Sequence, residues 1–237
     1  MHHLTAAHKI ASLTLMYNRE ICINFITGTS ISDLESINSF LEHSKRYDRL
    51  VEYIEIINRL LRSKSPQTYH VKYFQTKNLN LSKALNEKMM PDFFIAGAST
   101  DAQNARFQTN ARGIDMGKPI RNLPYYESIP PILHFGVATG PTGEAAQDKM
   151  KLDFSSKYDD IEDIFEIALA NTDAAWKRRL ILETEDNIYS LIPLKNMTAD
   201  CPYLVGSCNT VADYINGYVQ KGINTFIIEA DESDLMA

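Results

Sequence analysis

The sequence predicts an α/β fold with parallel strands and helices between them. Short apolar, β-branched segments recur along the chain, and helical segments follow or precede them. Such alternation suits an α/β barrel or a doubly wound sheet. The 237 residues are enough for one large domain with its own core. Four strand segments are clear: Ile21–Ile26, Phe93–Ala96, Ile132–Ala138 and Ile223–Glu229.

The start of the chain is expected to run helix, strand, loop, helix. The first helix covers about Ala6–Met16, and the strand after it ends at Thr27-Gly28, where a polar loop begins. Ser44 is a good N-cap for a second helix that runs to about Arg62. This helix is amphipathic, with one apolar stripe formed by Leu50, Ile54, Ile57 and Leu61.

The next segments are expected to form a hairpin and a second unit of strand, turn and helix. Tyr69–Thr76 reads as an exposed hairpin arm, and Gly97-Ala98-Ser99 reads as a tight turn before a helix over Thr100–Gln108. This turn, like the loop after Thr27-Gly28, joins a strand end to a helix N-terminus. Helix N-termini offer unpaired N–H groups and a positive dipole end, so both places can hold a phosphate.

The second half is expected to continue the alternation, with one irregular connection. Gly113–Met116 is a short strand, and Thr184–Tyr203 is predicted to be irregular because it contains two prolines. Ser207 or Asn209 caps the last helix, which Gly222 ends. The helices of this half are expected over Glu144–Leu152, Ile161–Leu169, Asp173–Leu180 and Thr210–Lys221.

Composition excludes several classes of partner. The net charge is −6 and no long basic run occurs, so a nucleic acid is not expected. The apolar runs are too short to span a bilayer, so we expect no membrane segment. The N-terminus does not read as a signal peptide. The three cysteines, Cys22, Cys201 and Cys208, fit no metal motif, so we expect free thiols in the cytoplasm and no metal site.

Four stretches are more specific than the pattern of elements: NFITG (24–28), FLEHSKRYD (40–48), PDFFIAGAS (91–99) and GINTFI (222–227). In this order they resemble the bacterial luciferase-like flavin-dependent monooxygenases, in particular their alkanesulfonate monooxygenase-like branch. The second stretch is the most specific, because it is similar to the family's F-L-x-H-x-x-R-Y signature. The resemblance extends from about Ala6 to Ile228. It implies a (β/α)8 TIM barrel and a single domain over residues 1–237.

The resemblance also implies an activity. Family members are enzymes that bind reduced FMN at the C-terminal ends of the barrel strands, where such barrels place their sites. Oxygen adds to the flavin, and the resulting flavin peroxide transfers one oxygen atom to the substrate. This chain would therefore act on a small-molecule substrate, with FMN reduced by a separate flavin reductase. A homo-oligomer is a further expectation.

The resemblance implies where FMN would bind. Asn24 and Thr27 would lie beside the isoalloxazine and the ribityl chain, while His43 and Tyr47 would hydrogen-bond the phosphate. The physics of the residues agrees, because Tyr47 falls three residues after Ser44 and so near a helix N-terminus. Gly97 and Ser99 would offer a backbone donor and a hydroxyl donor to the same phosphate.

The chain also departs from the family pattern. It offers only about five strands, around Ile21, Phe93, Gly113, Ile132 and Ile223, so we expect an incomplete barrel that lacks the first strands and has exposed edges. The branch's catalytic residues have no counterparts here, and the catalytic residues stay unassigned. Two alternatives therefore stand beside the monooxygenase: a catalytically silent paralogue that acts as a flavin-binding or partner subunit, and a deazaflavin-dependent oxidoreductase.

Overall fold

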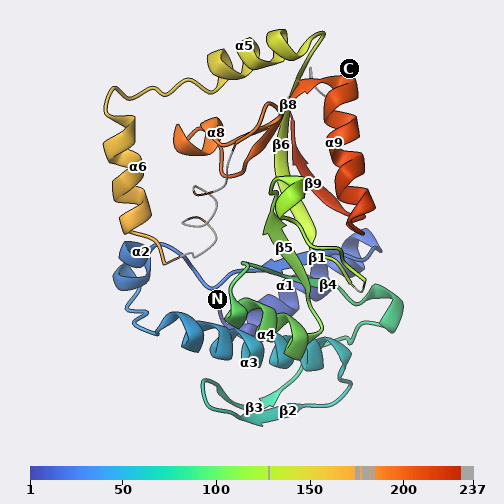
Figure 1. Cartoon of the computed structure of the whole chain (residues 1–237). Helices are drawn as coiled ribbons and strands as arrows, with labels where there is room; N and C mark the ends of the chain where they lie inside the picture. Colours follow the sequence, from blue (N-terminus) through green and yellow to red (C-terminus); the bar gives the residue numbers. More distant parts are fainter. Residues whose placement is uncertain (128, 174–176, 178–181, 183–184, 231–237) are drawn as a thin grey trace. The chain divides into compact units, whose positions relative to one another are not determined.

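The structure of the chain, a computed structural model, describes residues 1–127, 129–173, 177, 182 and 185–230 (Figure 1). It divides into two compact units. The first consists of Met1–Gly28 and Leu34–Gly113, and the second of Thr29–Asp33 and Ile114–Ala237. Strands and helices alternate along both, which confirms the predicted α/β class. No helix of the described part is long and apolar enough to cross a membrane.

The first unit is built on one parallel strand pair with helices and a hairpin around it. β1 pairs with β4, so that Ile23 lies opposite Phe93 and Phe25 opposite Ile95. The elements of this unit are α1 (His3–Tyr17), β1 (Cys22–Phe25), α3 (His43–Arg62), β2 (Gln67–His70), β3 (Gln75–Leu79), η1 (Glu87–Met89), β4 (Asp92–Ala96) and α4 (Thr100–Thr109).

Helix α3 forms the centre of the first core. Its predicted apolar stripe is buried, and Ile57 and Leu61 have no exposed surface. The stripe packs on α1, which contributes Ala7 and Ile10, and α3 also contacts α4. Because burial of apolar area is the main source of folding free energy, α3 fixes the positions of the strand ends around it.

The predicted hairpin is present as the antiparallel pair β2 and β3. The chain between the two strands is fastened to α3 by one carboxylate. Oε1 of Glu52 accepts a hydrogen bond from the backbone N–H of Lys72 at 3.1 Å, and Oε2 accepts one from Tyr73 at 2.7 Å. The hairpin is therefore held at its tip as well as through its strands.

The second unit is a mostly parallel sheet centred on β6. β6 pairs in parallel with β5, β8 and β9, while β7 pairs with β8 in the antiparallel sense. Its elements are β5 (Arg112–Met116), at which the chain enters the unit, η2 (Ile120–Asn122), β6 (Ile132–Gly140), α5 (Gly143–Asp153), α6 (Ile161–Ala170), β7 (Tyr189–Ser190), α8 (Ile192–Lys195), β8 (Tyr203–Ser207), α9 (Cys208–Gln220) and β9 (Phe226–Glu229).

Two clusters of buried side chains hold this sheet. Helix α9 packs on β8 and β6, where Tyr218 contacts the ring of Phe135 and both are fully buried. Helix α5 also packs on β6 and β8, and its Ala146 and Met150 belong to a cluster with Tyr203 and Val205.

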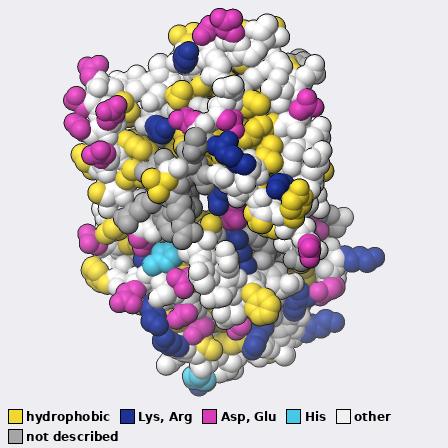
Figure 2. All heavy atoms as spheres, in the orientation of Figure 1, with side chains coloured by type: hydrophobic (Ala, Val, Ile, Leu, Met, Phe, Trp, Pro, Cys, Tyr) yellow, Lys and Arg dark blue, Asp and Glu magenta, His cyan; other side chains and the backbone are white. Residues whose placement is uncertain are grey.

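On the face drawn in Figure 2, acidic and basic side chains are interspersed among hydrophobic ones.

Several sequence predictions need correction. The segment Thr184–Tyr203 is not irregular throughout, because it contains β7 and α8 and reaches the first residue of β8. Its prolines do not break these elements: Pro193 sits at the start of α8, where its missing N–H is not needed, and Pro202 precedes β8. The loop after Gly28 also holds a short helix, α2 (Ile31–Ser36).

Over the described residues, six strands are paired in parallel, namely β1, β4, β5, β6, β8 and β9, one more than expected and fewer than the eight of a closed barrel. Ser44 is not an N-cap, since α3 begins at His43 and its cap position is Glu42. The cap of α9 is Ser207, one of the two residues predicted, and not Asn209. The predicted helix over Asp173–Leu180 lies mainly outside the described residues.

Candidate functional site

The end of β4 and the first turns of α3 and α4 meet at the hydroxyl of Tyr47. This hydroxyl donates a hydrogen bond to the carbonyl oxygen of Ala96 at 3.3 Å. The next residue, Gly97, has a φ of +116°, and a Cβ built on it would lie only 2.7 Å from the Tyr47 oxygen. A side chain at residue 97 would therefore be strained and would collide with the phenol, so glycine is required here.

Two further hydroxyls surround Tyr47. Burial raises the pKa of Tyr47, and hydrogen bonds from the side chains of Thr27 and Ser99 to the Tyr47 oxygen oppose this shift. Because the net shift is upward, Tyr47 is a neutral phenol that can donate a proton in a hydrogen bond. Ser99 also caps α4, since its hydroxyl accepts a hydrogen bond from the N–H of Ala102 at 3.2 Å.

His43 is the first residue of α3, and its ring lies beside that of Tyr47, with 5.2 Å between the ring centroids. Nδ1 of His43 is 3.3 Å from Oδ2 of Asp101, which belongs to the first turn of α4. The side chains of His43 and Asp101 are 28% and 40% exposed, so the pair opens to solvent. A carboxylate thus orients this imidazole through one ring nitrogen and leaves the other available.

The structure brings five of the six predicted residues together: Thr27, His43, Tyr47, Gly97 and Ser99. Asn24 is the exception. It is an exposed residue of β1, opposite Phe94, and the contacts described for the cluster do not include it.

Sequence reasoning missed Arg106, which fastens the same strand end from α4. Its Nε donates to the carbonyl oxygen of Ile95 at 3.1 Å, and its Nη2 donates to that of Gly97. Gly113 leaves room for this guanidinium, because a Cβ there would lie 2.4 Å from it. In the sequence Arg106 is only a basic residue near a helix C-terminus, so no local pattern indicates this role.

A cavity of about 400 Å³ adjoins the cluster through Thr27. Its size falls in the range of small-molecule sites. Two guanidinium groups and three aromatic rings line it, which suits an anionic or aromatic ligand. The lining residues are Met1, Phe25, Ile26, Thr27, Arg46, Arg49, Leu50, Tyr53 and Phe74.

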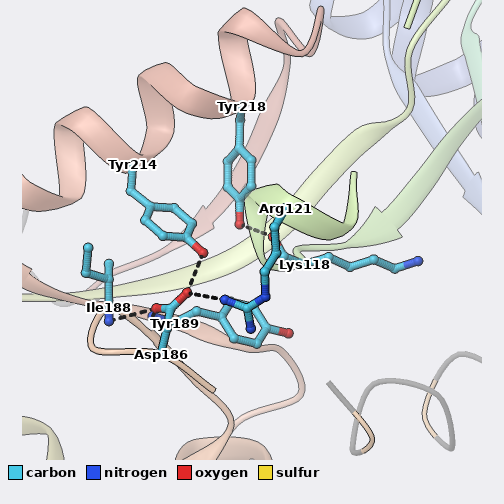
Figure 3. Close-up of polar contacts among 7 residues, drawn as sticks. All are labelled: Lys118, Arg121, Asp186, Ile188, Tyr189, Tyr214 and Tyr218. Atoms are coloured by element: carbon cyan, nitrogen blue, oxygen red, sulfur yellow. Dashed lines mark hydrogen bonds and ion pairs between the residues drawn. The ribbon is translucent and has the colours of Figure 1, made fainter. Parts of the chain in front are cut away.

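The second unit holds a separate polar cluster around Asp186 (Figure 3). Its Oδ2 accepts a hydrogen bond from the Tyr214 hydroxyl at 3.2 Å and lies 3.5 Å from Nη1 of Arg121, while Oδ1 accepts from the N–H groups of Ile188 and Tyr189. Burial raises the pKa of Tyr214, and the Asp186 carboxylate raises it further. These contacts join α9 to the start of β7, so the cluster has a structural role.

Comparison with known proteins points to the family that the motifs suggested. The family model described as "Luciferase-like monooxygenase" matches residues 1–114, which include all six predicted cofactor residues. Over these residues the chain is similar to the luciferase-like monooxygenase family. The predicted resemblance is confirmed, and by this resemblance the chain is a flavin-dependent enzyme.

Individual relatives agree with this assignment. The 4-(gamma-L-glutamylamino)butanoyl-[BtrI acyl-carrier protein] monooxygenase BtrO of Niallia circulans is 26% identical over 249 residues, covering 94% of this chain and 69% of BtrO. An F420-dependent secondary alcohol dehydrogenase in complex with an F420-acetone adduct superposes with a TM-score of 0.65 at 14% identity, covering 97% of this chain and 70% of that enzyme.

A second solved structure is the oxygenating constituent of 3,6-diketocamphane monooxygenase from the CAM plasmid of Pseudomonas putida, in complex with FMN. It has a TM-score of 0.65 and 16% identity, and the comparison covers 99% of this chain and 71% of that one. At these identities the solved structures establish the fold, which is that of the TIM-barrel family, as predicted. The luciferase-like chain spans about seven tenths of the length of each of these three proteins.

Proposed function

We propose that this luciferase-like chain is an FMN-dependent monooxygenase that receives reduced flavin from a separate flavin reductase and acts on a small-molecule substrate. The observation that carries the proposal is the meeting of His43, Tyr47 and Ser99 at the N-termini of α3 and α4, beside Gly97. Helix N-termini and hydroxyl donors together favour a phosphate. FMN differs from a free flavin ring in carrying that group.

In this proposal the phosphate lies against the hydroxyls of Tyr47 and Ser99 and against the free ring nitrogen of His43. Gly97 fits this role because the absence of a side chain makes room for the Tyr47 hydroxyl beside the backbone at the end of β4. Thr27 then lies beside the ribityl chain, since its hydroxyl is near Tyr47 and it also lines the large cavity. Asn24 would reach the isoalloxazine from the exposed face of β1.

The charges around the site decide how tightly a phosphate is held. Asp101 places a carboxylate near the phosphate position, which disfavours a second anion. The same carboxylate holds Nδ1 of His43 and so orients the imidazole at the site. The residues thus bind and orient the cofactor, while reduced FMN supplies the reaction with O2 that adds one oxygen atom to the substrate.

Further parts of the proposal concern organisation and location. We propose that residues 1–237 act as one luciferase-like domain, in the cytoplasm and as a homo-oligomer. The three free cysteines support a reducing compartment. The edge of β1 supports self-association, because β4 is its single partner strand among the described residues.

Two alternative functions keep specific support. The similarity to an F420-dependent dehydrogenase supports a deazaflavin-dependent oxidoreductase, because F420 also carries a phosphate next to its ribityl chain. The six parallel strands of the described part support a catalytically silent paralogue that binds flavin or serves as a partner subunit.

The deciding experiment is a titration of the purified chain with oxidised FMN, chemically reduced FMN and F420, followed by absorbance and fluorescence. Saturable micromolar binding of reduced FMN is expected, and oxygen consumption then separates an active enzyme from a flavin-binding partner. Preference for F420 would replace FMN by the deazaflavin. If a folded sample binds neither cofactor, the catalytically silent partner subunit is the one function of the three that still agrees with the data.

A further inference from the structure

Three side chains that the flavin site does not use meet in the second unit. They are His134 of β6, Cys201 just before β8 and Glu229 at the end of β9. Nε2 of His134 lies 2.9 Å from Oε1 of Glu229, and the nitrogen, sulfur and oxygen atoms of the three residues all lie within 4.8 Å of one another. Cys201 is fully buried, while the side chains of His134 and Glu229 are 18% and 40% exposed.

Strand register explains why residues so distant in sequence come together. Gly136 of β6 lies opposite both Tyr203 of β8 and Glu229 of β9, and paired residues of parallel strands point to the same face. His134 and Cys201 precede Gly136 and Tyr203 by two residues, so they share that face. A Cβ at Gly136 would lie 2.2 Å from the Tyr203 ring, so the glycine makes room for that ring on the same face.

We propose that His134, Cys201 and Glu229 bind a divalent cation of the zinc class. Sulfur, imidazole nitrogen and carboxylate oxygen are the three ligand types that Zn²⁺ takes in proteins. Zinc–ligand bonds of about 2.0–2.3 Å in a tetrahedral arrangement place ligand atoms about 3.3–3.8 Å apart, which small side-chain movements achieve here. Three protein ligands leave the fourth position for water, and the partly exposed Glu229 gives the ion a path to the site.

The binding step balances without any redox change. In the metal-free chain the Cys201 thiol hydrogen-bonds to the Glu229 carboxylate. When the metal–sulfur bond forms, the thiol proton leaves to solvent, and the neutral imidazole presents Nε2 with its proton on Nδ1. The thiolate and the carboxylate then neutralise the two positive charges of the ion. The bound cation would tie β6, β8 and β9 to one another.

The test is a titration of the full chain with Co²⁺, whose bond to a thiolate gives a charge-transfer absorption band. One Co²⁺ per chain is expected, displaced by Zn²⁺ and unaffected by Mg²⁺, which avoids sulfur. Cys201→Ser should lose the band, and His134→Gln and Glu229→Gln should each weaken Co²⁺ binding at least tenfold. The matched controls Cys22→Ser and Cys208→Ser should keep both the band and the affinity.

Several results would overturn the site: no band in the natural chain, a band that persists in Cys201→Ser, or a band lost in Cys208→Ser. Because Cys201 is buried, its variant has to be checked for folding by circular dichroism. Glu229→Gln decides the question if that variant does not fold, since Glu229 is partly exposed and the change preserves its shape. Co²⁺ binding by Glu229→Gln as tight as that of the natural chain would refute the proposal.

Discussion

The hydroxyl of Tyr47 fills the space that a side chain at residue 97 would occupy, because a Cβ on Gly97 would lie 2.7 Å from it. This single relationship couples α3 to the end of β4. The geometry of the proposed phosphate site can therefore be tested without a ligand. A substitution at Gly97 should disturb its packing against the Tyr47 phenol and so lower the stability of the fold.

Gly97→Ala is expected to lower the free energy of unfolding by about 1–3 kcal/mol, because alanine is strained at a positive φ and its Cβ meets the phenol. Denaturant unfolding measures this change. Gly143→Ala is the matched control, since a Cβ at Gly143 meets nothing within 4 Å. Adding Tyr47→Phe should recover the steric part of the loss, and equal losses with and without Tyr47→Phe would show that the two residues do not interact.

Removing the phosphate donors should weaken binding of reduced FMN. Tyr47→Phe and His43→Ala are each expected to cost on the order of 1.5–3 kcal/mol, because hydrogen bonds to a charged phosphate are lost. Fluorescence titration measures the dissociation constants. Tyr17→Phe and His8→Ala remove the same groups from exposed positions of α1 and should leave the affinity unchanged. Unchanged affinity in the Tyr47→Phe and His43→Ala double variant would remove both residues from the site.

Asp101→Asn tests the charge on the far side of His43. The amide keeps a hydrogen-bond partner for Nδ1 but removes the negative charge near the phosphate. We expect tighter FMN binding at low ionic strength and a smaller difference at high salt, because exposed charges are screened. Asp33→Asn, on an exposed residue of α2, is the control. Weaker binding by Asp101→Asn would contradict this, and would mean that the carboxylate contributes more by orienting His43 than it costs by repulsion.

Stability at low pH should depend on Glu185. Burial raises the pKa of this carboxyl, but the hydrogen bond from Lys195 at 2.8 Å and the one from the N–H of Leu191 at 2.6 Å outweigh it, so the pKa lies below the ordinary 4.5. A lowered pKa stabilises the fold above the unfolded value and loses that effect as the pH falls through the folded one. Glu185→Gln should therefore flatten the decline of melting temperature below about pH 4.5, and an unaltered decline would contradict this.

Among the described residues β1 has one partner strand, β4, and its other edge predicts self-association. Cys22 is an exposed residue of this strand, and a lysine there would place a charge on the edge. Cys22→Lys should shift the chain toward the monomer in sedimentation experiments. Met16→Lys, on an exposed position of α1, should not. A monomeric natural chain would argue against this edge as an interface.

Local signals in the sequence were enough for most elements of the fold. The apolar stripe of α3 and the hairpin follow from periodicity and turn chemistry within short windows, and the cap of α9 could be narrowed to Ser207 or Asn209. Ser44 misled because it is a good cap residue one position inside α3, whereas the carbonyl of Glu42 accepts the first helical hydrogen bond, from the N–H of Arg46. β8 was missed because the prolines near it suggested an irregular chain.

Part of the candidate site could likewise be predicted from the sequence, and part could not. His43, Tyr47 and Gly97 could be named in advance because the family motif carries them. The partners that hold them could not, because Asp101 is 58 residues from His43 and only the tertiary fold joins the two. Arg106 lies on a helix whose sequence gives no indication of an inward contact, so its hydrogen bonds to the C-terminal end of β4 could be found only in the structure.

The boundary between the two compact units falls at Gly113, one residue before the family match ends. Every residue proposed to hold the cofactor precedes this point, and the sheet centred on β6 follows it. Cofactor recognition and the rest of the chain can therefore diverge separately in evolution. Substitutions after residue 114 leave every residue proposed to hold the flavin unchanged.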